Sequence, residues 1–220
     1  MAAQVQVATL KRGESAFKTC AVSGLVTGVA AGDATNGHIW AFRFSPAVAG
    51  SPTNPLPKFA QITRLRARAF TVAGYTAAQE VGIDLSILRA YTVAHSGGTA
   101  LTLTGNNGRK ATYQNVAGPG SLVQPCGSTI RVATTAQLTA GTHTFDAQPI
   151  LSGAFSELAA AATTPKGAYE LYLSTEDLDK YPISLATGEG LCIRNTVAQG
   201  AGGTMRLTVE IDWLELARIA

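Results

Sequence analysis

Three arginines at alternating positions are the most distinctive polar feature of this sequence. Arg64, Arg66 and Arg68 are separated by single apolar residues. In a β-strand this spacing places the three guanidinium groups on one face, about 7 Å apart. The forked guanidinium group suits both carboxylates and phosphates. The row therefore has three interpretations: a face neutralised by acidic neighbours of the same chain, a protein interface, or a nucleic-acid site. We favour them in that order.

Glu210 and Asp212 form the second pattern that could do chemistry. Two carboxylates on one strand face could serve as the acid and the nucleophile of a glycoside hydrolase. Carboxylates at this spacing, near Arg206, are more typical of a solvated or interface face, and we favour that interpretation.

No local spacing in the sequence indicates a metal site or a nucleophile. The three histidines have no histidine neighbour at a ligand spacing, and no GxSxG motif is present; these histidines are His38, His95 and His143. The three cysteines are odd in number and far apart, so we expect free thiols, buried or half-buried, rather than disulfides; they are Cys20, Cys126 and Cys192. We expect no enzyme activity, no cofactor and no metal.

Composition narrows the class of protein further. Of 220 residues, 46% are hydrophobic and 14% charged, with a formal net charge of +3. This composition argues against intrinsic disorder, and no apolar stretch is long enough to span a membrane. The first residues do not form a secretory signal, which predicts synthesis in a reducing cytoplasm. Residues 1–150 carry a net charge of +7 and residues 151–220 a net charge of −4, so the two parts offer complementary faces.

The elements that must position these residues are predominantly strands. Alternating apolar residues predict strands near His38–Phe44, Gln61–Val72, Glu80–Val93, Gly190–Thr196 and Thr204–Trp213. In three of these five strands, Gln61–Val72, Glu80–Val93 and Thr204–Trp213, alternate residues are predicted to share one face toward the core. They are Leu65, Ala67, Ala69, Val81, Ile83, Leu85, Ile87, Tyr91, Val93, Met205, Leu207, Val209, Ile211 and Trp213.

Other local patterns predict the connections and the ends. Asn106, Asn107 and Gly108 predict a hairpin between Leu101–Thr104 and Arg109–Tyr113. Phe155–Ala162 is predicted as one short helix. Residues 1–36 lack periodicity and are predicted to form a flexible, extended N-terminal arm, followed by a single domain over residues 37–220. The fold class predicted is all-β: an antiparallel, jelly-roll-like β-sandwich.

The C-terminal third resembles a known class of proteins. Gly188–Thr196, the glycine-rich connection and Arg206–Trp213 resemble the closing strands of small virion structural proteins of tailed bacteriophages, especially capsid decoration or cement proteins. Pro149–Glu157 has the same character. The resemblance implies a non-enzymatic homotrimer with a jelly-roll core that binds the major capsid protein, and a location in the virion after synthesis in the host cytoplasm. It implies neither membrane nor nucleic-acid partners.

Two alternatives remain beside this interpretation. One is a tail, collar or fibre component of the virion. The other is a carbohydrate-binding β-sandwich that displays an aromatic platform, with Tyr75, Tyr91 and Tyr113 as candidates. For a protein interface, the candidate residues are Arg64, Arg66 and Arg68 together with Leu214 and Leu216, which would lie opposite the core face of the last strand.

Overall fold

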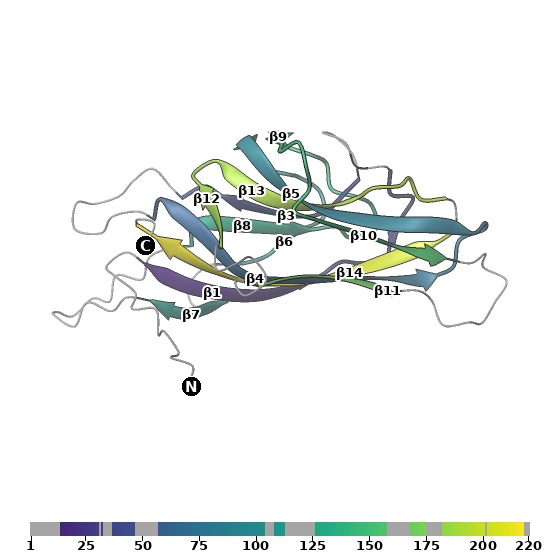
Figure 1. Ribbon diagram of the computed structural model, residues 1–220, viewed down its shortest axis with the longest axis horizontal. Coiled ribbons are helices and arrows are strands. Elements are labelled where there is room, and N and C mark those ends of the chain that lie inside the picture. The colour runs from purple at the N-terminus through teal and green to yellow at the C-terminus, as the bar shows by residue number, and fades with distance from the viewer. Residues whose placement is uncertain are drawn as a thin grey trace.

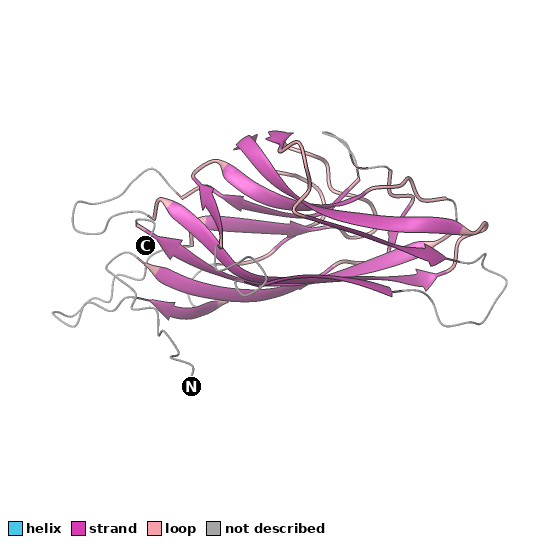
Figure 2. Cartoon of the chain, in the orientation of Figure 1, coloured by secondary structure: helices cyan, strands magenta, loops and turns pink. Residues whose placement is uncertain are grey.

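The computed structural model describes residues 14–30, 32, 37–46, 57–103, 108–112, 126–157, 168–174, 182–200 and 202–217. In this part of the chain all regular elements are strands, and they form two facing antiparallel sheets (Figures 1 and 2). The prediction of an all-β, antiparallel, jelly-roll-like sandwich is confirmed.

Sheet A forms one layer and has the strand order β11-β4-β14-β1-β7, with β12 also on β4 and β2 also on β14. Its strands are β1 (Ser15–Val22), β2 (Val26–Thr27), β4 (Phe59–Ala73), β7 (Arg109–Thr112), β11 (Ala168–Ser174), β12 (Ile183–Ala186) and β14 (Thr204–Leu216).

Sheet B forms the other layer and has the order β10-β5-β13-β3-β8-β6, with β9 also on β5. Its strands are β3 (His38–Phe44), β5 (Gln79–Val93), β6 (Thr99–Ala100), β8 (Ser128–Val132), β9 (Thr142–Phe145), β10 (Leu151–Glu157) and β13 (Glu189–Asn195).

The main core lies between the sheets and is built from the alternating faces that the sequence predicts. The inward residues of β14, from Met205 to Trp213, are all buried, as are Leu65, Ala67 and Ala69 of β4. Trp213 of sheet A stacks on Phe17, with ring centroids 5.1 Å apart, and meets the edge of Phe42 of sheet B at 5.4 Å. Edge-to-face and offset aromatic pairs add to the energy of burial, so this contact ties the two layers together.

The N-terminal arm is the largest correction to the sequence analysis. β1 lies inside sheet A, between β14 and β7, and pairs with β14 along its whole length from Ser15↔Glu215 to Val22↔Thr208. Phe17, Ala21, Val26 and Val29 are buried in the main core. Residues 15–29 are therefore sandwich rather than arm. Small residues hid the pattern, because only Phe17 carries a large apolar side chain in β1. Residues 1–13 lie outside the described residues.

The predicted helix and hairpin are also wrong where the structure describes them. Phe155–Glu157 continue β10, which pairs with β5, while residues 158–162 lie outside the described part. β7 pairs with β1 in sheet A, whereas the chain just before Leu101 forms β6 in sheet B. The strand that follows Gly108 therefore pairs with β1 and not with the segment around Leu101.

β5 changes its inward face part-way along. Val81, Ile83 and Leu85 are buried in the main core as predicted, but Tyr91 joins a separate small cluster and Val93 is exposed. Ala90 has a positive φ of 47°, and the register with β9 shifts between Arg89 and Val93. One residue in the left-handed region shifts the alternation by one position, as in a β-bulge.

Candidate functional site

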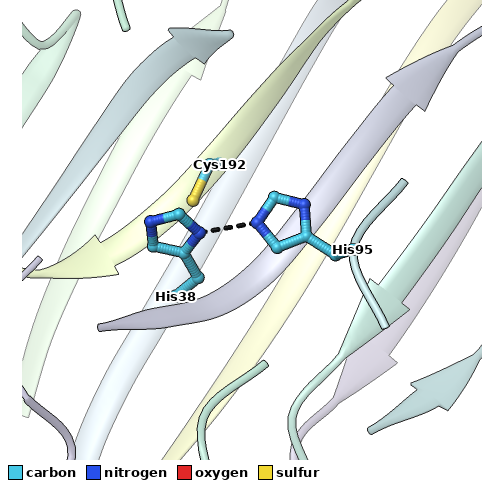
Figure 3. A group of neighbouring side chains, drawn as sticks. All are labelled: His38, His95 and Cys192. Atoms are coloured by element: carbon cyan, nitrogen blue, oxygen red, sulfur yellow. Dashed lines mark hydrogen bonds between the residues drawn. The ribbon is translucent and has the colours of Figure 1, made fainter. Parts of the chain in front are cut away.

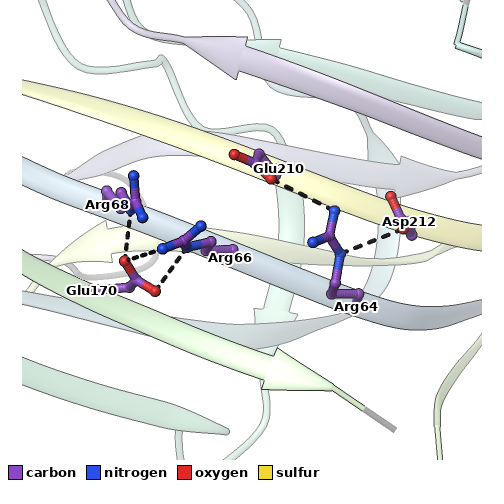
Figure 4. Close-up of polar contacts among 6 residues, drawn as sticks. All are labelled: Arg64, Arg66, Arg68, Glu170, Glu210 and Asp212. Carbon is purple, nitrogen blue, oxygen red and sulfur yellow. Dashed lines mark hydrogen bonds and ion pairs between the residues drawn. The ribbon is translucent and has the colours of Figure 1, made fainter.

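The arginine row, consisting of Arg64, Arg66 and Arg68, lies on the outer face of sheet A as the alternation predicts. Leu65 and Ala67, the residues between them, point into the core. Figure 4 shows the three side chains beside carboxylates from the two strands that flank β4, which are β11 and β14. The row is therefore in contact with acidic groups on both sides.

Glu170 of β11 binds two of the three arginines. Its carboxylate accepts hydrogen bonds from Nε and Nη2 of Arg66 at 2.7 and 3.0 Å, and one from Nε of Arg68 at 2.6 Å. The fork of Arg66 thus meets both carboxylate oxygens, the geometry that makes such pairs specific. Cross-strand register explains it, because Glu170 lies directly opposite Arg68.

Arg64 pairs with the two carboxylates that the sequence analysis considered as a glycosidase pair. Its Nη2 lies 3.5 Å from Glu210 and its Nε lies 3.4 Å from Asp212, both on β14. Three carboxylates from residues 151–220 thus face three arginines from residues 1–150. The expectation that acidic neighbours of the same chain neutralise the row is confirmed.

Apolar side chains share this outer face with the charged groups. Val22 of β1, Val72 of β4 and Tyr172 of β11 expose 51%, 39% and 47% of their surfaces. Tyr172 lies opposite Arg66, beside the ion pairs. The face therefore combines exposed apolar groups with charges that are already paired.

Leu214 and Leu216 do not form the exposed apolar pair that the sequence analysis expected. Leu214 is half-buried, whereas Leu216 exposes only 6% of its surface. The alternation ends at Glu215, so that Glu215 and Leu216 are both buried. Leu216 consequently offers little surface to a partner.

Two of the three tyrosines expected to form an aromatic platform for a carbohydrate are buried in the described part of the chain. Tyr75 and Tyr91 are buried, with at most 1% of each residue exposed. Tyr113 lies outside the described residues. Two of the three candidates are therefore inaccessible to a sugar ring.

The structure brings together a cluster that the sequence analysis missed. His38, His95 and His143 have ring centroids 4.8 to 5.4 Å apart, and Cys192 lies beside them (Figure 3 draws two of the histidines with the cysteine). Nδ1 of His38 and Nε2 of His95 are hydrogen-bonded at 2.6 Å. The residues come from β3, the segment after β5, β9 and β13, so no local spacing could have indicated them.

Burial shifts the titration of this cluster. Desolvation, with smaller contributions from the charges of His38, His143 and Arg131, lowers the pKa of His95 to about 3. Burial likewise lowers the pKa of His143 and raises the pKa of the Cys192 thiol. Burial also raises the pKa of Tyr91 to about 12. The imidazoles of His95 and His143 are therefore neutral at physiological pH.

The three cysteines form no disulfide, and their exposures differ. Cys192 is buried and Cys126 is half-buried, as the sequence analysis expected, but Cys20 is exposed on β1. Cys20 faces outward because it alternates with the buried Ala21 in the sheet.

Comparisons with known proteins leave the family open. No protein-family model matches the chain, and no curated protein matches its sequence. One similar solved structure is described as the 60-mer BFDV capsid protein; it is 11% identical, the match covers 94% of both chains, and the TM-score is 0.20. A similarity of this size carries no argument about fold or function. Among the described residues, no helix has the length and apolar character needed to cross a bilayer.

Proposed function

We propose that this chain is a non-enzymatic structural protein of a bacteriophage virion, a decoration or cement protein that binds the major capsid protein. The observation that carries the proposal is the outer face of sheet A. It presents Val22, Val72 and Tyr172 around arginines whose charges are already paired. Tyrosine and arginine are enriched in protein interfaces, and a face with paired charges loses less solvation energy on docking than one with free charges.

Neutralisation of the arginine row also favours a protein partner over a nucleic acid. Phosphate binding gains its affinity from cations that release counterions. Here the guanidinium groups already form ion pairs with the carboxylates of Glu170, Glu210 and Asp212. A partner that offers apolar groups and hydrogen bonds fits this face better than a polyanion does.

The resemblance of the C-terminal third to phage decoration proteins is the reason for proposing a phage capsid as the partner. The segments that carry it correspond to β10, β13 and β14, and β13 and β14 occupy central positions in the two sheets. In this proposal the free energy of binding across neighbouring capsid subunits stabilises the shell against rupture.

We propose a closed homotrimer as the bound form. Closed cyclic symmetry buries an adhesive surface between copies and leaves no free end to which further copies can add. The number three comes from the resemblance to phage decoration proteins. Light scattering on the purified chain tests it: a trimer has a mass of about 68 kDa, three times the 22.7 kDa chain. A stable monomer or dimer at micromolar concentration would refute the trimer.

Quantification of the chain in purified virions tests the assignment. A decoration protein is present at a copy number comparable to that of the major capsid protein, and labelled antibody decorates the head. A copy number comparable to that of a neck or tail ring would instead support the tail or collar alternative. Absence from virions would refute both.

Binding of the recombinant chain to undecorated capsids tests the proposed face. Tyr172→Glu places a charge on this face and is expected to weaken co-sedimentation with capsids by at least ten-fold, the loss that about 1.4 kcal/mol produces. The matched control is Val93→Glu, because Val93 is also exposed, at 56% against 47% for Tyr172, but belongs to sheet B. If both variants bind like the unmodified chain, the face is wrongly assigned.

A further inference from the structure

The histidine cluster lies outside the main core, on the other face of sheet B. Cys192 alternates along β13 with Leu191 and Ile193, which belong to the main core, so its side chain points away from the sandwich interior. His38, His95 and Cys192 are all buried, and one potential ligand atom of each lies within 4.8 Å of the others. Three elements far apart in sequence therefore deliver three ligand-type side chains to one point.

We propose that this cluster is a zinc site in which His38, His95 and Cys192 bind the ion and His143 completes a tetrahedral set. Imidazole nitrogen and thiolate sulfur are the ligands that zinc prefers, and four of them close a structural site. The site is independent of the virion assignment above.

The spacing of the ligand atoms fits a zinc ion after a small adjustment. Tetrahedral zinc, with bonds of about 2.0–2.3 Å, holds its ligand atoms about 3.3–3.8 Å apart. The 2.6 Å between Nδ1 of His38 and Nε2 of His95 lies below this range, and the upper limit of 4.8 Å lies above it. Side-chain rotations that move the atoms by about 1 Å or less bring all three into the zinc range.

The ring nitrogens of His143 provide separate evidence for a bound ion. Both of its ring nitrogens are buried and have no hydrogen-bond partner among the described residues. Its ring stacks on His95, with centroids 5.2 Å apart, and lies 5.4 Å from the ring of His38. A buried polar atom without a partner is destabilising, and a metal ion bound to one of these nitrogens removes that cost.

Tyr91 acts as the positioning residue for His95. The Tyr91 hydroxyl is hydrogen-bonded to Nδ1 of His95, which leaves Nε2 directed at His38. Metal-binding histidines generally hold the second ring nitrogen in such a bond, and it fixes the orientation of the ring.

One member of the cluster, His95, borders a pocket. A pocket of about 220 Å³ is lined by His95, Tyr91 and Arg131, among others. This pocket provides the entry path that a metal site needs. Binding replaces the proton of the Cys192 thiol by the ion, and that proton passes to solvent, so the affinity for zinc rises with pH.

Titration of the full-length, reduced chain with zinc in competition with a chelator tests the site. We expect one ion per chain, and a higher unfolding temperature with zinc than with EDTA. Cys192→Ser changes one ligand atom and is expected to weaken binding by at least about 100-fold, the upper end of what loss of an outer-shell partner costs. Cys20→Ser is the matched control, because Cys20 is exposed on sheet A.

Cobalt substitution provides an absorption signal that reports ligation by Cys192 and does not depend on the stability of the fold. The cobalt-loaded chain is expected to show a thiolate-to-metal charge-transfer band in the near ultraviolet, which Cys20→Ser retains and Cys192→Ser loses while circular dichroism shows the fold intact. Tyr91→Phe is expected to weaken zinc binding about 10–100-fold without loss of that band.

Three results would overturn the proposal or part of it. The site is refuted if the unmodified chain binds no stoichiometric zinc, or if Cys192→Ser and Cys20→Ser bind it equally. Unchanged affinity in a folded His143→Gln variant would overturn the assignment of His143 as the fourth ligand.

Discussion

Glu215 reaches from the end of β14 in sheet A to the backbone amide of Gly127, at the start of β8 in sheet B. The amide donates to Oε2 of Glu215 at 2.8 Å, and the Ser128 hydroxyl donates to Oε1 at 2.7 Å. The indole N–H of Trp213 donates to the same Oε1 at 3.3 Å. With 1% of the residue exposed, this carboxylate links the two layers through hydrogen bonds inside the protein.

Replacement of Glu215 by alanine is expected to lower the free energy of unfolding by about 3 kcal/mol or more, because several buried donors lose their acceptor. Chemical denaturation measures it. Glu210→Ala on the outer face of the same strand is the control, and its ion pair with Arg64 limits the loss to about 1 kcal/mol. Equal losses in the two variants would contradict the role given to Glu215.

Phe17→Ala is expected to lower the free energy of unfolding by about 3–5 kcal/mol, because a buried ring that stacks on Trp213 is removed. Lys18→Ala, at the exposed neighbouring position, is expected to change it by less than about 0.5 kcal/mol. Urea denaturation of both variants decides whether β1 is core. A Phe17→Ala variant as stable as Lys18→Ala would restore the interpretation of this segment as an arm.

The chain is expected to show no steeply salt-dependent binding to duplex DNA, because Glu170, Glu210 and Asp212 neutralise the arginine row. Glu170→Gln frees Arg66 and Arg68 and is expected to increase weak, salt-sensitive DNA binding. Fluorescence anisotropy with labelled DNA over a series of salt concentrations measures both. Tight binding by the unmodified chain that is lost when all three arginines are replaced would contradict this prediction.

The metal-free chain is expected to lose stability in mild acid. In the unfolded chain His95 has its ordinary pKa near 6.5, whereas in the folded chain burial lowers it to about 3. Between these values the unfolded state binds a proton that the folded state does not, so the free energy of unfolding falls with falling pH, by about 1.4 kcal/mol per pH unit.

Denaturant unfolding in EDTA at pH values between about 8 and 5 measures this slope. Stability is expected to be level above about pH 7, where His95 is neutral in both states, and to decline below about 6.5. The titratable and charged groups around His95 are His38, His143, Tyr91, Cys192 and Arg131, and the Arg131 charge also opposes its protonation. Constant stability across this range would contradict the lowered pKa of His95.

Alternation along single strands carried most of the correct sequence predictions. The inward faces of β14 and of the centre of β4 follow from period-two patterns alone, because a strand with one buried face must alternate. The same pattern placed the arginine row on the outer face. The bulge at Ala90 shows its limit, since alanine carries no sequence sign of the positive φ that moves Tyr91 to the other face.

Features that depend on long-range pairing could not be predicted. β1 has few large apolar side chains, and only its position between β14 and β7 shows that it is core. The histidine cluster arises because β3, β5, β9 and β13 lie side by side in sheet B, which no window of neighbouring residues encodes. The prediction of a short helix was wrong for the same reason, because pairing with β5 outweighs the helix preference of Phe155–Glu157.

The place of β14 between β1 and β4 has a consequence for biosynthesis. β1 is made early, yet one of its two neighbours is β14, about 190 residues further along the chain. Until the ribosome has released β14, β1 and β4 have no common neighbour, and the apolar side of sheet A stays uncovered. Folding of this layer therefore awaits the synthesis of β14, and until then the unpaired strands of the nascent chain are prone to aggregation.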